Sequence, residues 1–149
     1  MKEEILFADK STHLYHKEKF LPDQLAEQAV TIMQKTRFTA SKHLKERVGI
    51  DKSHEFTIEK IYEAIENAKA VNTKPFEIGT NNGLLSKFVI RTQYDASRDI
   101  SIVFYCSIKK IWTAWLNDSN DLHTTLDESK YADKSKWESE CKFHYDNDV

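Results

Sequence analysis

The stretch Lys87–Asn117, KFVIRTQYDASRDISIVFYCSIKKIWTAWLN, constrains the fold of this chain more than any other segment. It contains three runs rich in β-branched and aromatic residues, 87–94, 100–105 and 110–116, and only short segments separate them. Such runs are typical of β-strands. Because connections this short cannot make the crossover that parallel strands need, the pattern predicts antiparallel pairing.

Side chains alternate between the two faces of a strand, so Ile90 and Arg91 are expected on opposite faces of this sheet. An arginine at position 91, with Thr113 on a nearby strand, has two readings. It is either an ordinary surface residue or part of a polar site on the sheet.

The residues before the sheet predict helices. Apolar side chains recur at helical spacing in two segments, 22–35 and 53–67. Ser41 or Thr39 can cap a shorter helix that Gly49 would end. Asn82-Gly83 is a hairpin signal that would make 75–78 a fourth strand. Helices followed by strands predict an α+β fold, with N-terminal helices packed on a roughly four-stranded antiparallel sheet.

The length of 149 residues predicts a single domain with a sizeable core. Within it, residues 38–131 are the expected core, residues 1–20 an N-terminal appendage and residues 132–149 a charged tail. His13 and His16 would share one helical face, but two histidines without further ligands are weak evidence for a metal. Solvated surface histidines are the expectation there.

Composition narrows the class of partner. The chain is 40% apolar and 31% charged with a net charge of −2, which predicts a folded protein without a global basic field. Two cysteines imply neither a disulfide framework nor a metal cage. The N-terminus MKEEILFADK has acidic residues where a signal peptide has positive charge, and no stretch has transmembrane length. We expect no cofactor, no metal and no membrane, action in the cytoplasm, and delivery by another route if the chain is exported.

Three polar residues stand out as candidates for chemistry. His43 and Arg47 are four residues apart, so both lie on one face of the short helix. Together they can contact an anion, or they can form an exposed polar face. His123 lies between polar residues in a loop directly after a predicted strand, a place where functional residues are often found.

The order of these elements resembles a known group of nucleases. SKHLKERVGI and TIEKIYEAIENA, followed by KFVIRTQYD, DISIVF and IWTAWLNDSNDLHTTLDESKY, are similar to nuclease-like domains of the barnase, EndoU, colicin and RelE superfamily, in its phage and polymorphic-toxin branches. The resemblance covers residue 38 to about residue 131. It implies a compact α+β domain and a toxin that cleaves tRNA or another structured RNA without a metal. A cognate immunity protein or antitoxin would be a further partner.

The resemblance also implies roles for individual residues. The reaction needs a base for the ribose 2′-hydroxyl, an acid for the departing 5′-oxygen, and donors for the charged phosphorane. His43 would be the base or the acid, because the pKa of histidine lies near neutrality. Arg91 would clamp the phosphate and Thr113 would donate a hydrogen bond to it. His123 would supply the second proton-transfer group.

Arg47 and three aromatic residues, Tyr94, Trp115 and Tyr131, are the implied substrate-binding residues. Aromatic rings often stack on the bases of single-stranded RNA. Plain core packing is the alternative for each ring. The near-neutral net charge departs from the basic character of many toxin nucleases. A non-catalytic binding module on the same scaffold is therefore the alternative function.

Overall fold

The strands expected between residues 87 and 117 form the centre of the structure, a computed structural model that describes residues 12–121 and 127–139. β4 (Leu84–Gln93), β5 (Arg98–Tyr105) and β6 (Lys110–Asp118) pair antiparallel in that order. β5 lies in the middle, and every residue from Ile100 to Tyr105 is buried. The predicted antiparallel arrangement of these strands is confirmed.

A fourth strand, β3 (Glu77–Asn81), is joined to β4 by a two-residue turn. Its central residues, Asn82 and Gly83, have φ angles of 53° and 78°. Positive φ at both positions is what a type I′ hairpin requires, and Asn-Gly adopts it at little cost. The predicted hairpin is confirmed.

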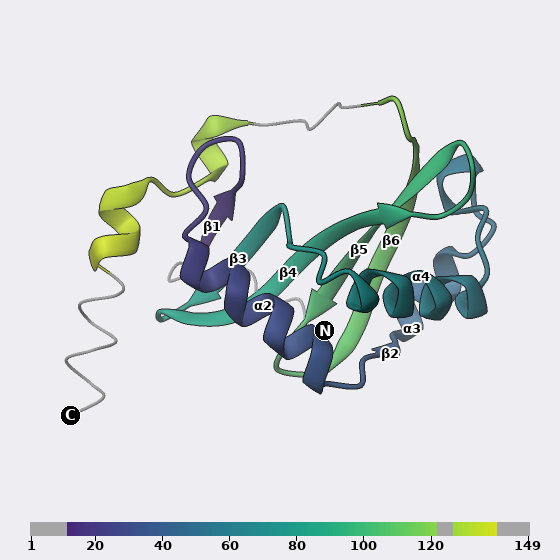
Figure 1. Ribbon diagram of the computed structural model, residues 1–149, viewed down its shortest axis with the longest axis horizontal. Helices are drawn as coiled ribbons and strands as arrows, with labels where there is room; N and C mark the ends of the chain where they lie inside the picture. Colours follow the sequence, from purple (N-terminus) through teal and green to yellow (C-terminus); the bar gives the residue numbers. More distant parts are fainter. Residues whose placement is uncertain (1–11, 122–126, 140–149) are drawn as a thin grey trace.

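Two short strands that the sequence pattern does not predict complete the sheet. β1 (Thr12–His16) pairs antiparallel with β3, and β2 (Thr39–Ala40) pairs parallel with β6. The sheet is therefore mixed and has six strands in the order β1-β3-β4-β5-β6-β2 (Figure 1). The α+β class is confirmed. The roughly four-stranded, wholly antiparallel sheet is wrong at its edges, because strands this short carry too little periodicity to be recognised.

Helices α2 (Asp23–Lys35) and α4 (Ile58–Ala70) cover one face of the sheet (Figure 1). Each turns an apolar stripe toward the strands, as its spacing predicts. The rings of Phe88 and Phe104 stack beneath them with centroids 4.7 Å apart, and Phe38 packs edge-on against both. The main hydrophobic core lies between this sheet face and the two helices.

The start of α4 differs from the prediction. The helix begins at Ile58 rather than at Ser53, because Thr57 caps it by accepting the Lys60 N–H at 3.2 Å. The preceding residues form a separate 3-10 turn, η1 (Lys52–His54). There Asp51 accepts a hydrogen bond from Ser53 Oγ at 2.7 Å. The predicted single helix is therefore divided into a 3-10 turn and a capped α-helix.

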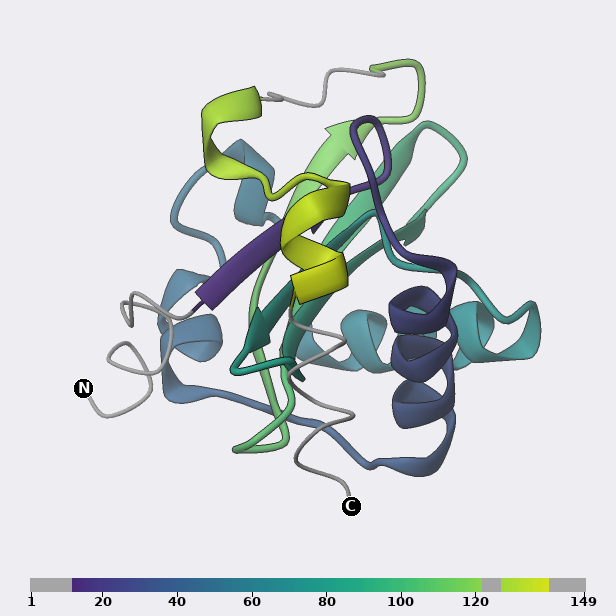
Figure 2. The same cartoon turned by 90° about the vertical axis from the view of Figure 1, so that its left-hand side faces the viewer.

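Residues 12–16 form an edge strand instead of the solvated helical face expected for His13 and His16. Tyr15 is fully buried and His16 is 2% exposed. The Ala132 N–H donates to the Leu14 carbonyl at 2.6 Å, and the Trp137 ring packs edge-on against Tyr15. The 3-10 helix η2 (Glu128–Lys130) and helical residues 134–139 therefore lie against β1 (Figure 2). The outer parts of the predicted appendage and tail, 1–11 and 140–149, fall outside the described residues.

Candidate functional site on the second sheet face

The sheet face opposite α2 and α4 collects several residues that the sequence analysis singles out. Paired residues of neighbouring strands point to the same face. The pairing of β4, β5 and β6 places two rows of side chains on this second sheet face: Arg91, Ser101 and Trp115 in one row, and Val89, Val103 and Thr113 in the next. The candidate residues Arg91 on β4 and Thr113 and Trp115 on β6 therefore lie on the same face.

His43 lies at the β6 margin of this face. Buried Ser41 begins α3 (Lys42–Arg47) by accepting the Leu44 N–H at 3.0 Å, and its hydroxyl donates to the Trp112 carbonyl at 2.9 Å. This pair of bonds fastens the helix to β6. The His43 ring stacks on Trp112 at 5.0 Å, and Trp112 stacks on Tyr105 at 4.9 Å. The imidazole is therefore held by packing at a defined position.

Two of the implied substrate-binding residues lie elsewhere. Arg47 is exposed at the end of α3, one turn beyond His43. Tyr94 follows β4 on the helix-covered side of the sheet and packs against the main core. The Lys60 ammonium and the Arg98 guanidinium lie over its ring, 5.2 Å and 5.5 Å from the centroid. Core packing, the alternative reading for this ring, describes the position of Tyr94.

Arg91 is held by three hydrogen bonds. Its Nε donates to Asp99 Oδ2 at 2.9 Å, and its Nη2 donates to the carbonyls of Asp118 and Asp121 at 3.0 Å and 2.7 Å. The guanidinium thus ties β4 to β5 and to the segment that follows β6. Its Nη1 has no hydrogen-bond partner among residues 12–121 and 127–139. Arg91 is therefore fixed in place with one pair of N–H groups available.

Tyr131 reaches the second sheet face from the segment that packs against β1. Its hydroxyl donates to Glu77 Oε1 at 2.6 Å, while Glu77 Oε2 pairs with Lys87 Nζ at 3.2 Å. Burial, together with the hydrogen bond to Glu77 and the nearby negative charge, raises the pKa of the Tyr131 phenol above its ordinary value. The phenol therefore stays protonated at neutral pH and acts as a donor. His123 falls outside the described residues.

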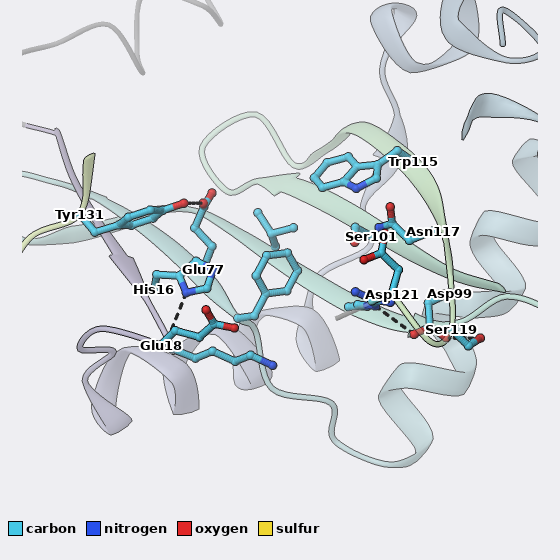
Figure 3. Close-up of a pocket in the computed structure, with 14 residues that line it drawn as sticks. His16, Glu18, Glu77, Asp99, Ser101, Trp115, Asn117, Ser119, Asp121 and Tyr131 are labelled. Atoms are coloured by element: carbon cyan, nitrogen blue, oxygen red, sulfur yellow. Dashed lines mark hydrogen bonds and ion pairs between the residues drawn. The ribbon is translucent and has the colours of Figure 1, made fainter. Parts of the chain in front are cut away.

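A cavity of about 540 Å³ runs across this face between Tyr131 and Trp115 (Figure 3). At one end lie His16, Glu77 and Tyr131, and at the other lie Asp99, Ser101 and Trp115. Phe76 and Val89 line the apolar part. Most of the other lining residues are polar or charged, and the size of the cavity is within the range of small-molecule sites.

The charged residues of the cavity are mostly acidic. Four carboxylates line it against two permanent cations: Glu18, Glu77, Asp99 and Asp121 against Lys17 and Arg91. In the described part of the chain, no three His, Cys, Asp or Glu side chains are arranged to hold a metal ion. No helix in that part is long and apolar enough to cross a membrane. The cavity therefore favours ligands that offer hydrogen-bond donors as well as a negative group for Arg91.

Sequence reasoning missed several residues of this cavity. Asp99 and Ser101 alternate with apolar residues in the first half of β5, so this alternation was an available signal. His16 and Glu77 had no such signal. They become neighbours only through the pairing of β1 with β3, in which the two residues are directly opposite.

The second sheet face thus carries a fixed guanidinium, a threonine hydroxyl, an imidazole at its β6 margin and a cavity lined by polar and apolar groups. Arg91 lines this cavity, whereas His43 and Thr113 do not. These groups can transfer a proton, bind an anion and accept a planar ligand. No protein-family model, curated protein or solved structure matches this chain.

Proposed function

We propose that this chain is a metal-independent ribonuclease that cleaves tRNA or another structured RNA by attack of a ribose 2′-hydroxyl on the adjacent phosphate. One observation carries the proposal. His43, Arg91 and Thr113 are up to 70 residues apart in the sequence, yet all three lie on or beside the second sheet face. They belong to the chemical types that the reaction needs.

His43 is the proton-transfer group of the proposed reaction. Its ring is stacked on Trp112 and partly exposed, so one edge is open to a substrate on the sheet. An imidazole is suited to remove the 2′-hydroxyl proton or to protonate the 5′-oxygen, because it titrates near neutral pH. The stack on Trp112 limits its orientation, which favours productive geometry.

Arg91 and Thr113 would stabilise the phosphate. The available Nη1 of Arg91 can donate to a phosphate oxygen while Nε and Nη2 stay bound to the protein. A donor that is already fixed needs no reorganisation during the reaction. Trp115, next to Ser101 and Arg91 in one row, offers a ring on which a base can stack.

A non-catalytic binding module is the second candidate. It is favoured by the pairing of Arg91 with Asp99 at 2.9 Å, which reduces the positive charge that a phosphate would meet. The excess of carboxylates in the cavity points the same way. On this reading the second sheet face binds a ligand and leaves RNA intact.

The test is cleavage of total RNA by purified protein in excess EDTA, analysed on a denaturing gel. The informative variant is His43→Phe, because a flat ring keeps the stack on Trp112 while losing proton transfer. We expect the wild type to fragment RNA and His43→Phe to be inactive at unchanged stability. His54→Ala, which alters a histidine on η1, is the matched control and should cleave like the wild type.

The result separates the two candidates. RNA that stays intact with folded wild-type protein would leave the binding module as the better account. Equal cleavage by the wild type and His43→Phe would retain the ribonuclease and remove His43 from its mechanism.

A further inference from the structure

The cavity on the second sheet face contains polar atoms that the protein itself leaves unpaired. Ser101 is 2% exposed and lines the cavity, yet its hydroxyl has no hydrogen-bond partner in the described part of the chain. Buried hydroxyl groups normally have a partner, since an unmet hydrogen bond is costly. The hydroxyl is therefore available to a hydrogen-bonding group in the cavity, which a bound ligand could supply.

His16 presents a second unpaired group to the cavity. It is 2% exposed, and its Nδ1 accepts the Glu18 N–H at 3.1 Å. A neutral ring that accepts at Nδ1 has its proton on Nε2. No residue in 12–121 or 127–139 accepts a hydrogen bond from that Nε2. The ring is therefore held at Nδ1, and its Nε2 N–H is left available to a ligand in the cavity.

Ser101 and His16 lie at opposite ends of the cavity, and each has a charged residue directly opposite it on the neighbouring strand. Ser101 is directly opposite Arg91 in the β4–β5 pairing, so its hydroxyl and the guanidinium project from the same face and both line the cavity. Both are donors, so this end suits an anion. His16 is directly opposite Glu77 in the β1–β3 pairing, which puts a donor beside an acceptor. A carboxylate has about four acceptor sites, so Glu77 can accept more than the bonds from Tyr131 and Lys87.

The spacing between the two ends of the cavity suits a ligand with a planar ring at one end and an anionic group at the other. Glu77 is opposite Val89 and therefore diagonal to Arg91, a separation of about 7–8 Å between neighbouring strands. Phe76 and Val89 contribute apolar surface to the cavity, and the rings of Tyr131 and Trp115 lie at its two ends (Figure 3). A planar heterocycle can pack there, and the separation leaves room for a sugar before the anionic end.

We propose that this cavity binds one nucleotide of the RNA, with the base edge read by His16 and Glu77 and the phosphate held by Ser101 and Arg91. This inference rests on the proposed ribonuclease function and adds to it a substrate subsite and its specificity residues. A donor next to an acceptor recognises the edge of a base, where acceptor and donor groups are adjacent. A fixed anion-binding pair recognises any phosphate.

The proposal is tested by calorimetric titration of full-length protein with the four ribonucleoside 3′-monophosphates and with inorganic phosphate. We expect the nucleotides to bind more tightly than phosphate, with a preference among the four bases. Ser101→Ala should weaken all four nucleotides about tenfold, because it removes one hydrogen bond to a charged group. Ser135→Ala, in helical residues 134–139 and away from the cavity, should bind like the wild type.

Glu77→Gln tests the reading of the base. The Tyr131 hydroxyl can still donate to the amide oxygen, so that contact is kept. The amide group that replaces Oε2 loses the ion pair with Lys87 and turns one acceptor into a donor. We expect the preference among the four bases to change while the affinity for inorganic phosphate stays the same. An unchanged base preference in Glu77→Gln would refute the assignment of the base edge to this residue.

The outcomes distinguish this inference from the proposed function. Wild-type protein that cleaves RNA but binds no nucleotide, or binds inorganic phosphate equally well, would overturn the nucleotide subsite and leave the ribonuclease intact. Nucleotide binding that is weakened about tenfold in Ser101→Ala, in a protein that never cleaves RNA, would support the subsite and overturn the catalytic function.

Discussion

Replacing Arg91 with alanine should destabilise the protein, apart from any role of Arg91 in catalysis. The substitution removes the ion pair with Asp99 and two hydrogen bonds to the carbonyls of Asp118 and Asp121. Hydrogen bonds to charged groups contribute roughly 1.5–3 kcal/mol each. The Arg91 and Asp99 side chains are 21% and 23% exposed, so hydrogen bonds to water can replace part of the lost hydrogen-bond energy. We expect a loss of about 3 kcal/mol.

The loss is large enough to measure and small enough to leave a folded protein. Domains are typically stable by about 5–15 kcal/mol, and for this size 1 kcal/mol lowers Tm by about 2–4 °C. The midpoint should therefore fall by about 6–12 °C. Urea unfolding followed by circular dichroism gives the free energy of unfolding directly. Arg37→Ala is the matched control, since Arg37 is exposed, and it should change stability by less than about 0.5 kcal/mol.

A double-mutant cycle with Asp99→Ala isolates the ion pair itself. Because the two residues are in contact, we expect a coupling energy of about 1–2 kcal/mol. A loss below about 1 kcal/mol in Arg91→Ala, with no coupling to Asp99→Ala, would refute the structural role derived above. Because Arg91 variants are expected to be less stable, their RNA cleavage must be measured at a temperature where each variant is folded.

Three further predictions concern other parts of the molecule. Ser41→Ala removes the cap of α3 and the hydrogen bond to Trp112, so it should lower the free energy of unfolding by about 2 kcal/mol. It should also reduce RNA cleavage, because α3 positions His43, whereas Ser53→Ala on η1 should leave cleavage unchanged. Full activity in Ser41→Ala would argue against positioning by α3. The hydrogen bond from Arg98 lowers the pKa of Asp95 in the folded protein below 3.8. The unfolded chain therefore binds more protons near that pH, and the Asp95–Arg98 pair stabilises the folded protein above pH 3.8. This stabilisation is lost as the pH falls through the lower pKa of the folded state. Asp95→Asn should therefore flatten the acid limb of urea-unfolding curves, and an unchanged limb would contradict the pairing. Burial raises the pKa of the Cys106 thiol to about 12, so in a Cys141→Ser variant a thiol reagent at neutral pH should react only after urea is added; rapid labelling of the folded protein would contradict this.

Much of the fold could be predicted because its pattern is local. The alternation in 87–116 predicts three strands and puts Arg91 on the face opposite to Ile90, which is buried in the main core. The Asn-Gly turn and α2 were recognisable for the same reason, since turn chemistry and helical spacing are properties of neighbouring residues.

The candidate site was only partly predictable. His43 stood out through its spacing from Arg47, but the stack that fixes it involves Trp112, which is far away in the sequence. Tyr94 looked like Trp115 in the sequence and lies on the other side of the sheet, beside Lys60. An aromatic residue in a strand signals packing, and which surface it packs against depends on the register of that strand.

The sequence by itself determined the central antiparallel strands and the opposite directions of Ile90 and Arg91, because periodicity and turn preference act between near neighbours. Only the tertiary structure decided the edges of the sheet, the partners of Arg91 and the pairing of His16 with Glu77. Strand pairing brings together residues about 60 positions apart, and no local pattern specifies that register. β1 contributes His16 to the cavity because it pairs with β3 at the edge of the sheet.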